Sequence, residues 1–302
     1  MAAGRIFQPV RGRGLRKLLW KRLYLPRAVV HPVLSAAKVA ANPAQVRLRR
    51  ELAADCGSAF EISPEAGFRL LSDGELPGAG AAVDRCAEIF RRMRAEDNLE
   101  GHLFNRHKRF LLALLAGEDF CAQPELIRLM ISRPVLDTAT AYLGEVPILA
   151  GAALWWTPEN ETAERSQLFH FDGEDERQLK LILNVFDTRE EHGPFTLLPA
   201  AASAPLRRSS ALRRRISDAQ VDAVCGLGEA VALQGSAGSG GFVDTSRCLH
   251  FGSRRSRKQR LVLMAQFTRF QCPTESTFAF AVPPGLPGLD PDPIQKLALG
   301  LV

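Results

Sequence analysis

Hydrophobic residues in the second half of the chain occur in short runs that predict β-strands. From about residue 146 onward these runs alternate with turns rich in Gly, Pro and charged residues, as ILAGAALWW, LFHFD, LKLILNVFD, FTLLP, AVAL, GFVDT and LVLMAQF. Many short strands separated by turn residues are typical of an all-β barrel or jelly roll. We therefore expect a cupin-like double-stranded β-helix with its core over about residues 146–270.

The preceding segment, about residues 80–145, has a helical period instead. Apolar residues recur every three or four positions from Ala81 to Asn98, which predicts an amphipathic helix. Shorter helices are predicted from Pro124 to Ile131 and from Pro134 to Leu143, where Pro begins each helix and a Gly follows the second. We expect these helices to buttress the outside of the sheet, so the fold class is mainly β with flanking α.

The first fifty residues differ from the rest of the chain in charge. They contain 12 of the 39 Lys and Arg residues and none of the 33 acidic ones, which leaves 27 basic residues in 51–302. An arginine-rich segment without acids is typical of organelle-targeting peptides. Leucines at helical spacing equally favour an interfacial helix or an arm packed on the body; these are Leu15, Leu18, Leu19 and Leu23. All three interpretations of residues 1–50 stay open, and residues 51–302 are expected to form one domain.

Composition excludes several classes of protein. The longest apolar stretch, Ile148 to Trp156, is about half as long as a membrane-spanning helix, so we expect no transmembrane segment. The net charge of +6 comes from the N-terminal arm, and no RNP, zinc-finger or helix-turn-helix pattern occurs, so we expect no nucleic-acid partner. Six cysteines without a CxxC pair fit a reducing compartment. We expect a cytoplasmic protein, unless the basic arm directs it to an organelle.

The strand LFHFD carries the most informative chemistry, together with a histidine eighty residues later. His170 and Asp172 are two residues apart, so an extended strand would point both to one face and Phe169 and Phe171 to the other. His250 can supply a third ligand. Two imidazoles and one carboxylate are the facial set that holds Fe(II) and leaves positions open for a co-substrate and O2. We therefore predict that these three residues bind iron and form the catalytic centre.

A basic residue ten positions after His250 indicates which co-substrate binds beside the metal. A strand over LVLMAQF would turn Arg260 and every second residue after it to one face, namely Val262, Met264 and Gln266. A guanidinium buried in a barrel needs a planar anion, and the far carboxylate of 2-oxoglutarate would be a bidentate partner for it. Arg260 is therefore the predicted 2-oxoglutarate-binding residue.

With these motifs the chain resembles the phytanoyl-CoA dioxygenase-like family of Fe(II)/2-oxoglutarate-dependent oxygenases, from about Arg128 to Phe270. The motifs follow the order of the family: H-x-D at 170–172, a GPF turn at 193–195, DT-x-x-x-x-H ending at His250, and a basic residue ten positions later. The family often has a Pro-Gly-Ser-His turn after GPF. This chain has LLPAAAS at Leu197–Ser203 instead, which leaves the shape of that loop open.

The resemblance implies an enzyme that hydroxylates, or otherwise oxidises, a small organic substrate with O2 while converting 2-oxoglutarate to succinate and CO2. It also implies that Lys180, at the start of LKLILNVFD, faces 2-oxoglutarate or the substrate; a surface lysine is an equally good interpretation. Gln167 lies three residues before His170 and is a candidate for a hydrogen bond to a metal-bound carboxylate. The substrate itself is not predicted, because selectivity depends on loops that carry no readable pattern.

Two other functions are compatible with the same residues. A non-catalytic binding protein could keep a cupin-like barrel, and a cupin metalloenzyme could use the three ligands without 2-oxoglutarate. The second would not need Arg260. A complete ligand set together with Arg260 favours the oxygenase.

The segment from Ser203 to Gly241 is rich in arginine and contains a short predicted helix that Ser217 would cap. Insertions between barrel strands often cover the mouth of an active site. This one could present its arginines to an anionic substrate, or it could be a solvated basic loop. The arginines are Arg207, Arg208, Arg213, Arg214 and Arg215.

Overall fold

The structure is a computed structural model, which describes residues 27–97, 99, 110–209, 215–276 and 278–302. The leucines of the N-terminal arm, Arg213 and Arg214 lie outside these residues, so the expectations about them are not addressed. Within the described residues, no helix combines the length and the apolar character needed to cross a bilayer.

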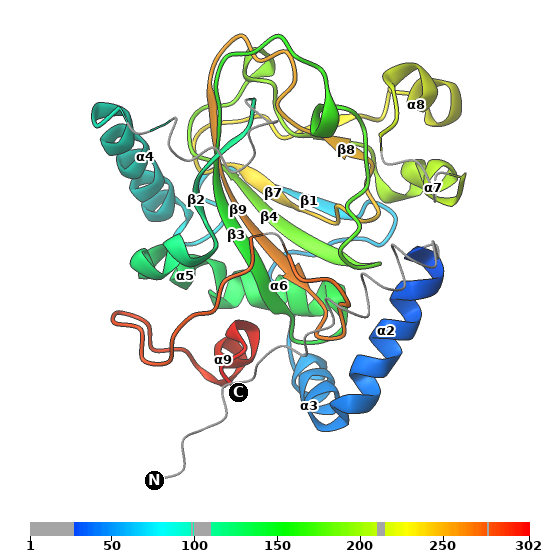
Figure 1. Cartoon of the computed structure of the whole chain (residues 1–302), viewed down its shortest axis with the longest axis vertical. Coiled ribbons are helices and arrows are strands. Elements are labelled where there is room, and N and C mark those ends of the chain that lie inside the picture. Colours follow the sequence, from blue (N-terminus) through cyan, green and yellow to red (C-terminus); the bar gives the residue numbers. More distant parts are fainter. Residues whose placement is uncertain (1–26, 98, 100–109, 210–214, 277) are drawn as a thin grey trace.

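Two antiparallel sheets form the centre of the fold (Figure 1). The larger sheet has the spatial order β1 (Phe68–Leu71), β7 (Gly240–Val243), β4 (Gln178–Asn184), β9 (Arg260–Thr268), β3 (Ile148–Thr157) and β2 (Leu112–Ala116). The smaller sheet has the order β6 (Val231–Ala232), β5 (Thr196–Leu197) and β8 (His250–Phe251). The predicted double-stranded β-helix is therefore confirmed. The predicted strand LFHFD is shorter than expected, since only isolated bridges form there, at Phe169 and His170.

Side chains of the larger sheet alternate between the inside of the barrel and its outside. On β9, Val262 and Met264 point inward and pack with Ile182 of β4, whereas Leu261 and Leu263 point outward into the core beneath the helices. This is the alternation expected for a strand with both faces buried. It confirms the prediction that alternate side chains of β9 share one face, and it places Arg260 on the inner face with Val262.

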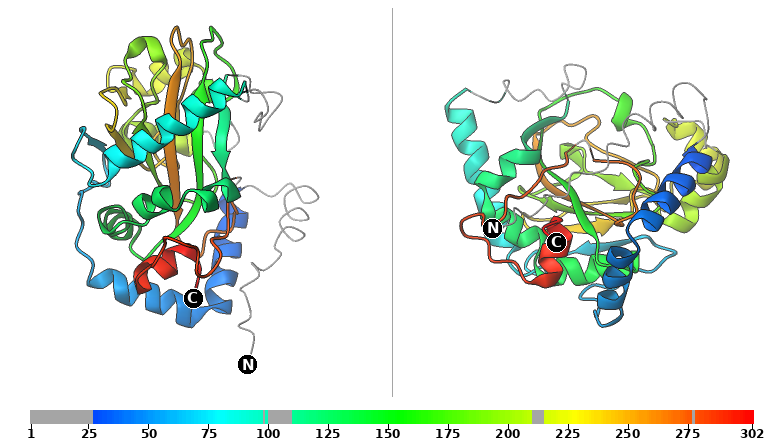
Figure 2. Two further views of the ribbon diagram at one scale, coloured as in Figure 1. Left: turned by 90° about the vertical axis from the view of Figure 1, so that its left-hand side faces the viewer. Right: turned by 60° about the horizontal axis from the view of Figure 1, so that its bottom comes forward.

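Three helices cover the outer face of the larger sheet, as Figures 1 and 2 show. They are α4 (Ala79–Ala95), α5 (Pro124–Met130) and α6 (Arg133–Leu143). Their apolar stripes face the outward side chains of the strands, and Gly144 ends α6 in the left-handed conformation. All three predicted helices are confirmed, with ends that differ by at most three residues from the predicted ones.

The outer face of the smaller sheet is covered by α7 (Ala200–Ser209) and α8 (Asp218–Cys225). Leu206 of α7 and Val221 of α8 pack with Phe169 and Phe251. The predicted cap of α8 is confirmed, because Ser217 accepts a hydrogen bond from the backbone N–H of Gln220. Both helices therefore bury apolar surface on this side of the barrel.

The segment after the GPF turn, LLPAAAS, runs into helix α7 and does not form a further turn. Ser203 anchors it, because the buried hydroxyl donates to the Leu198 carbonyl at 3.1 Å and accepts from the Leu249 N–H at 2.9 Å. The alanines from Ala200 favour a helix over a turn. The LLPAAAS segment thus leads directly from β5 into α7.

The N-terminal helices α2 (Arg27–Ala41) and α3 (Pro43–Ala54) are joined to the body by a buried arginine. Arg49 is 1% exposed and donates hydrogen bonds to the carbonyls of Val146, Pro147 and Leu297, at 2.9, 3.2 and 2.8 Å. Leu297 lies on the C-terminal helix α9 (Pro293–Leu299). The expected boundary at residue 50 therefore falls inside a helix that is tied to the barrel.

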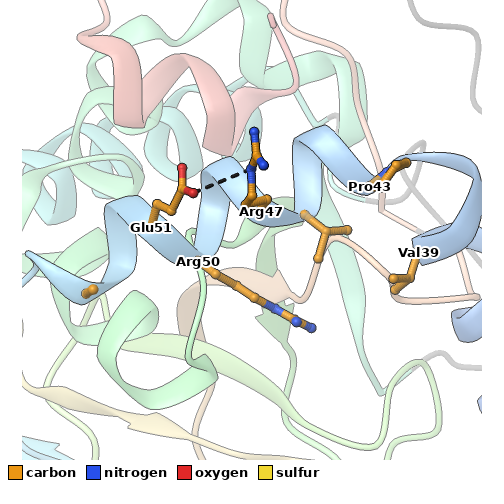
Figure 3. A pocket seen from close by; sticks show the side chains of 7 residues that line it. Val39, Pro43, Arg47, Arg50 and Glu51 are labelled. Atoms are coloured by element: carbon orange, nitrogen blue, oxygen red, sulfur yellow. Dashed lines mark ion pairs between the residues drawn. The ribbon is translucent and has the colours of Figure 1, made fainter.

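A groove also runs along α2 and α3 (Figure 3). Arg47 and Glu51 form an exposed ion pair at its edge, with the guanidinium Nε 3.5 Å from the carboxylate. The groove contains none of the predicted site residues. It is lined by Val39, Pro43, Val46, Arg47, Arg50, Glu51 and Ala54.

Candidate metal centre

The three predicted metal ligands converge. His170 Nε2 lies 3.9 Å from Asp172 Oδ1, and His250 Nε2 lies 3.7 Å from Asp172 Oδ2. One ligand atom from each of the three residues lies within 4.8 Å of the others. Two ligands bonded to one ion at about 2.1 Å are separated by up to about 4 Å. The three side chains are therefore placed to hold a single metal ion.

Backbone hydrogen bonds hold the ligand-bearing segments together, although they lie eighty residues apart in the sequence. His170 and His250 exchange N–H to carbonyl bonds of 2.9 and 3.0 Å. The N–H of Asp172 donates to the carbonyl of Thr245 at 2.9 Å. These bonds fix the position of all three ligands without any side-chain contribution.

The turn before His250 is built around Asp244, whose carboxylate is fully buried. It accepts hydrogen bonds from the Tyr142 hydroxyl at 2.7 Å, the Ser246 hydroxyl at 2.6 Å and the Arg247 N–H at 3.2 Å. These hydrogen bonds compensate for the loss of water around the buried carboxylate. The turn is thereby tied to helix α6, which carries Tyr142.

Both imidazoles have their metal-facing nitrogen free for a ligand bond. The Nδ1 of His170 lies 2.9 Å from the carbonyl of Leu168, and the Nδ1 of His250 lies 2.9 Å from the carbonyl of Cys248. Since a carbonyl only accepts, these contacts assign the proton to Nδ1 and leave Nε2 with its lone pair. Burial lowers the pKa of His170 to about 3, with the charge of His250 adding to the effect, so the ring is neutral near pH 7.

Lys180 is a buried partner of the carboxylate ligand. Its Nζ lies 2.7 Å from Asp172 Oδ2, and the side chains of Lys180 and Asp172 are only 14% and 16% exposed. Burial alone would raise the pKa of Asp172, but Lys180 and, to a smaller extent, His250 and His170 together outweigh it and hold that pKa well below its usual range. Lys180 therefore keeps Asp172 ionised, and it is not the surface lysine considered from the sequence.

Arg260 is buried, and no acidic side chain among the described residues forms an ion pair with it. It is 5% exposed, and no hydrogen bond or ion pair within the described residues satisfies its Nε. Burial lowers its pKa to about 10, so the guanidinium stays charged at neutral pH. Its Nη2 would lie 3.7 Å from a Cβ atom on Gly252, two residues after His250. The structure thus places an unpaired cation next to the strand that carries the third ligand.

Phe195 contributes to the site in a way that we did not predict. Its ring stacks on the imidazole of His250, with centroids 5.1 Å apart and planes 21° from parallel. Phe195 belongs to the GPF turn, whose Gly193 has a φ of 59°. The motif was visible in the sequence, but the contact joins two segments far apart in the chain.

A row of buried polar side chains extends from the turn before His250. Gln178 donates to the Thr245 hydroxyl at 2.9 Å, Gln266 donates to Gln178 at 3.0 Å, and Ser276 donates to Gln266 at 2.9 Å. Only Gln266 was placed on the inner face from the sequence. The others escaped notice because their partners lie across strands.

Gln167 lies in the loop before His170 and has its hydrogen-bonding groups engaged there. Its amide donates to Asn160 Oδ1 at 2.9 Å and to the carbonyl of Ser253 at 2.8 Å. Its oxygen accepts from the N–H of Glu164 at 2.9 Å. A hydrogen bond from this amide to a metal-bound carboxylate would have to replace one of these bonds.

Comparison with known proteins gave similar folds but no similar sequence. No family model matches the chain, and no curated protein does. EctD from S. alaskensis with bound Fe aligns over 74% of this chain and 81% of its own, with a TM-score of 0.51 and 15% identity. This chain has the same fold.

Two further solved structures are similar at slightly lower scores. EctD from S. alaskensis with 2-oxoglutarate and 5-hydroxyectoine aligns over 74% of this chain and 80% of its own, with a TM-score of 0.49 and 15% identity. HygX from Streptomyces hygroscopicus with nickel and 2-oxoglutarate bound aligns over 68% and 84%, with a TM-score of 0.48 and 13% identity. The three solved structures were crystallised with a metal ion, with 2-oxoglutarate or with both.

Proposed function

We propose that this protein is an Fe(II)- and 2-oxoglutarate-dependent oxygenase of the phytanoyl-CoA dioxygenase-like family. It would hydroxylate, or otherwise oxidise, a small organic substrate and form succinate and CO2. The observation that carries the proposal is the pairing of the convergent ligand set with the buried, unpaired guanidinium of Arg260.

The ligand set fits Fe(II). Two neutral imidazoles and one carboxylate, from His170, His250 and Asp172, are the donors of the facial triad that leaves positions open on the metal. Their Nδ1 hydrogen bonds to carbonyls orient both rings toward the ion. When bound, Fe(II) and 2-oxoglutarate supply the oxidant, as O2 is reduced and 2-oxoglutarate is oxidised to succinate and CO2.

Arg260 would bind the carboxylate of 2-oxoglutarate that does not chelate the metal. A buried guanidinium without a partner is costly, and a planar carboxylate satisfies it with two parallel hydrogen bonds. Lys180 would keep the ligand Asp172 ionised and oriented through the 2.7 Å contact. We keep Gln167 only as a residue that shapes the loop before His170, because its amide groups are engaged.

The burial of Arg260 supports the oxygenase over the alternative of a cupin metalloenzyme that does not use 2-oxoglutarate. Such an enzyme needs the three ligands but has no use for a buried cation. The same reasoning weighs against a binding protein without turnover, because a vacant ligand set and a buried unpaired charge both destabilise a scaffold.

Substitution of Arg260 tests the proposal. We expect Arg260→Met to retain stoichiometric Fe(II) while its affinity for 2-oxoglutarate falls about a hundredfold or more, because two charge-assisted hydrogen bonds are lost. Affinity is measured anaerobically from the visible charge-transfer band of the Fe(II) chelate. Arg257→Met, which removes an exposed arginine three residues away, is the matched control. Equal 2-oxoglutarate affinity in Arg260→Met and Arg257→Met would favour the metalloenzyme alternative.

A further inference from the structure

Helix α2 packs on the protein with its polar side and turns its apolar side to solvent. His31 is buried, Ser35 and Lys38 are half-buried, and the Lys38 ammonium donates a hydrogen bond to the Cys272 carbonyl at 3.3 Å. Lys38 also lies over the ring of Phe270, 4.9 Å from its centroid. A helix on the surface of a protein normally has its apolar residues toward the core. Helix α2 therefore exposes the side that such a helix usually buries.

The exposed side of α2 is apolar throughout residues 30–41, the part of the helix whose side chains are described. Its members recur at four-residue steps in two adjacent rows, which together cover about half of the helix circumference. Val33 is 60% exposed, more than any other large apolar side chain among the described residues. We call this surface the α2 face; it consists of Pro32, Val33, Ala36, Ala37, Ala40 and Ala41.

The groove along α2 and α3 borders the α2 face and extends its apolar surface (Figure 3). Val39 lines the groove and lies three residues after Ala36 of the α2 face, which is the spacing of neighbours on a helix. Pro43 and Val46 continue the apolar lining on α3, and Leu48 of the same helix is 41% exposed. A continuous apolar surface of this kind marks a site that interacts with a protein or a membrane.

The chain that leads into α2 contains positive charges and no negative ones. Residues 1–26 include seven Lys and Arg and no Asp or Glu, so this arm attracts an anionic surface. The arm also contains Trp20 and Tyr24, two residue types that favour the boundary between water and lipid. The basic residues are Arg5, Arg11, Arg13, Arg16, Lys17, Lys21 and Arg22.

These charges favour a lipid surface over a second copy of the chain. In a two-fold dimer the same surface of both copies meets, which would bring two basic arms together and make them repel each other. Anionic lipids instead attract basic residues next to the surface, by about 1 kcal/mol for each residue. Helix α2 has 15 residues, fewer than the roughly 20 that span a bilayer, so it would lie in the plane of the surface.

We propose that the α2 face binds the surface of a membrane that contains anionic lipids. Its apolar side chains would enter the boundary between the head groups and the acyl chains, and the basic residues of the arm would bind the head groups. Helices α2 and α3 lie at the edge of the molecule, so a flat surface can approach the α2 face (Figures 1 and 2). This inference does not depend on the proposed oxygenase activity.

Co-sedimentation of the full chain with lipid vesicles tests the inference. One set of vesicles is phosphatidylcholine alone, and the other contains equal parts of phosphatidylcholine and phosphatidylserine. Val33→Glu and Ala37→Glu each place a negative charge on the α2 face. The matched control is Val224→Glu, which adds the same charge at a valine of α8 that is 52% exposed. A fourth variant tests the arm and replaces four basic residues by Gln; these are Arg16, Lys17, Lys21 and Arg22.

We expect the natural chain and Val224→Glu to bind the phosphatidylserine vesicles equally, and to bind phosphatidylcholine at least about tenfold more weakly. Salt should weaken the binding to phosphatidylserine. Val33→Glu and Ala37→Glu should each weaken it at least about tenfold, because each places a charge where an apolar contact would form and opposes the anionic surface. The arm variant should weaken it by at least the same factor. Since both substituted residues are exposed, the fold should stay intact, which urea unfolding checks.

Four results would overturn the inference. If the natural chain does not bind the phosphatidylserine vesicles, lipid does not cover the α2 face. Equal affinity for the two kinds of vesicle would contradict the role of anionic lipids. If Val33→Glu and Ala37→Glu bind as tightly as Val224→Glu, the arm binds lipid without α2. If sedimentation velocity without lipid shows a dimer that Val33→Glu dissociates, a second copy of the chain covers the α2 face.

Discussion

The ammonium of Lys180 lies 2.7 Å from the carboxylate of Asp172, and this buried pair sits beside the two imidazoles of the metal centre. Without a metal ion, Lys180 is the cation that balances the charge of Asp172. A bound metal ion would place a second positive charge next to this carboxylate. The contribution of Lys180 to the stability of the protein should therefore be larger when the metal site is empty than when it is occupied.

From this coupling we expect Lys180→Met to destabilise the metal-free protein by on the order of 3 kcal/mol, since it leaves a buried carboxylate unpaired. Saturating Mn(II) should recover much of that loss, so the metal should raise the melting temperature more in the variant than in the natural chain. Lys258→Met, at an exposed lysine, is the control. Equal destabilisation with and without metal would show that Lys180 does not act through Asp172.

Arg49 provides a test of how firmly the N-terminal helices belong to the body. Arg49→Met removes three hydrogen bonds to buried carbonyls, and we expect the free energy of unfolding to fall by on the order of 3 kcal/mol. The matched variant Arg47→Met breaks only the exposed pair with Glu51, and the expected change is below about 0.5 kcal/mol. Urea unfolding measures both. Similar small changes would mean that α3 contributes little to the stability of the barrel.

The GPF turn should be sensitive to a single methyl group. Gly193 has a φ of 59°, and a Cβ atom there would overlap the Ser256 hydroxyl and approach the Arg254 carbonyl oxygen to 2.8 Å. We expect Gly193→Ala to cost about 3 kcal/mol from backbone strain and overlap together. Gly226→Ala is the control, because Gly226 has a φ of 72° but nothing within 4 Å, so about 1 kcal/mol is expected. If thermal unfolding shows that Gly193→Ala and Gly226→Ala lose the same stability, the predicted overlap at the GPF turn is refuted.

A buried thiol should make the protein less stable in alkali. Burial raises the pKa of Cys86 from 9.0 to about 12. Between these values the unfolded chain releases a proton that the folded chain keeps, so the free energy of unfolding falls as pH rises. From pH 9.0 to 10.5 this one group accounts for up to about 2 kcal/mol. Urea unfolding of Cys86→Ala should show a shallower decline over this window, and an unchanged decline would contradict the assignment.

Much of the fold was predictable because local pattern and burial agree. The alternation along β9 assigned Val262 and Met264 to the inside, and the structure bears this out. Pro at the start of α5 and Gly after α6 marked helix ends that lie within a residue of those observed. The face that such a strand residue occupies, or the end of such a helix, depends on residues nearby in the sequence, so one sequence is enough to predict it.

The rest depends on contacts between distant segments. Phe195 stacks on His250, and Arg49 bonds to a carbonyl of α9 almost 250 residues later; neither contact has a local signature. The outward orientation of the apolar side of α2 has no local signature either, because the spacing of its apolar residues is the same whether they face the body or the solvent.

The central claim is that His170, Asp172 and His250 hold one iron ion with room for 2-oxoglutarate beside it. Anaerobic titration of the natural chain with Fe(II) and then 2-oxoglutarate tests this most directly, with His250→Ala as the comparison. We predict one Fe(II) per chain and a visible charge-transfer band that develops only when both are present and is lost in His250→Ala. A chain that retains no Fe(II), or that binds Fe(II) and 2-oxoglutarate equally well without His250, would contradict the account.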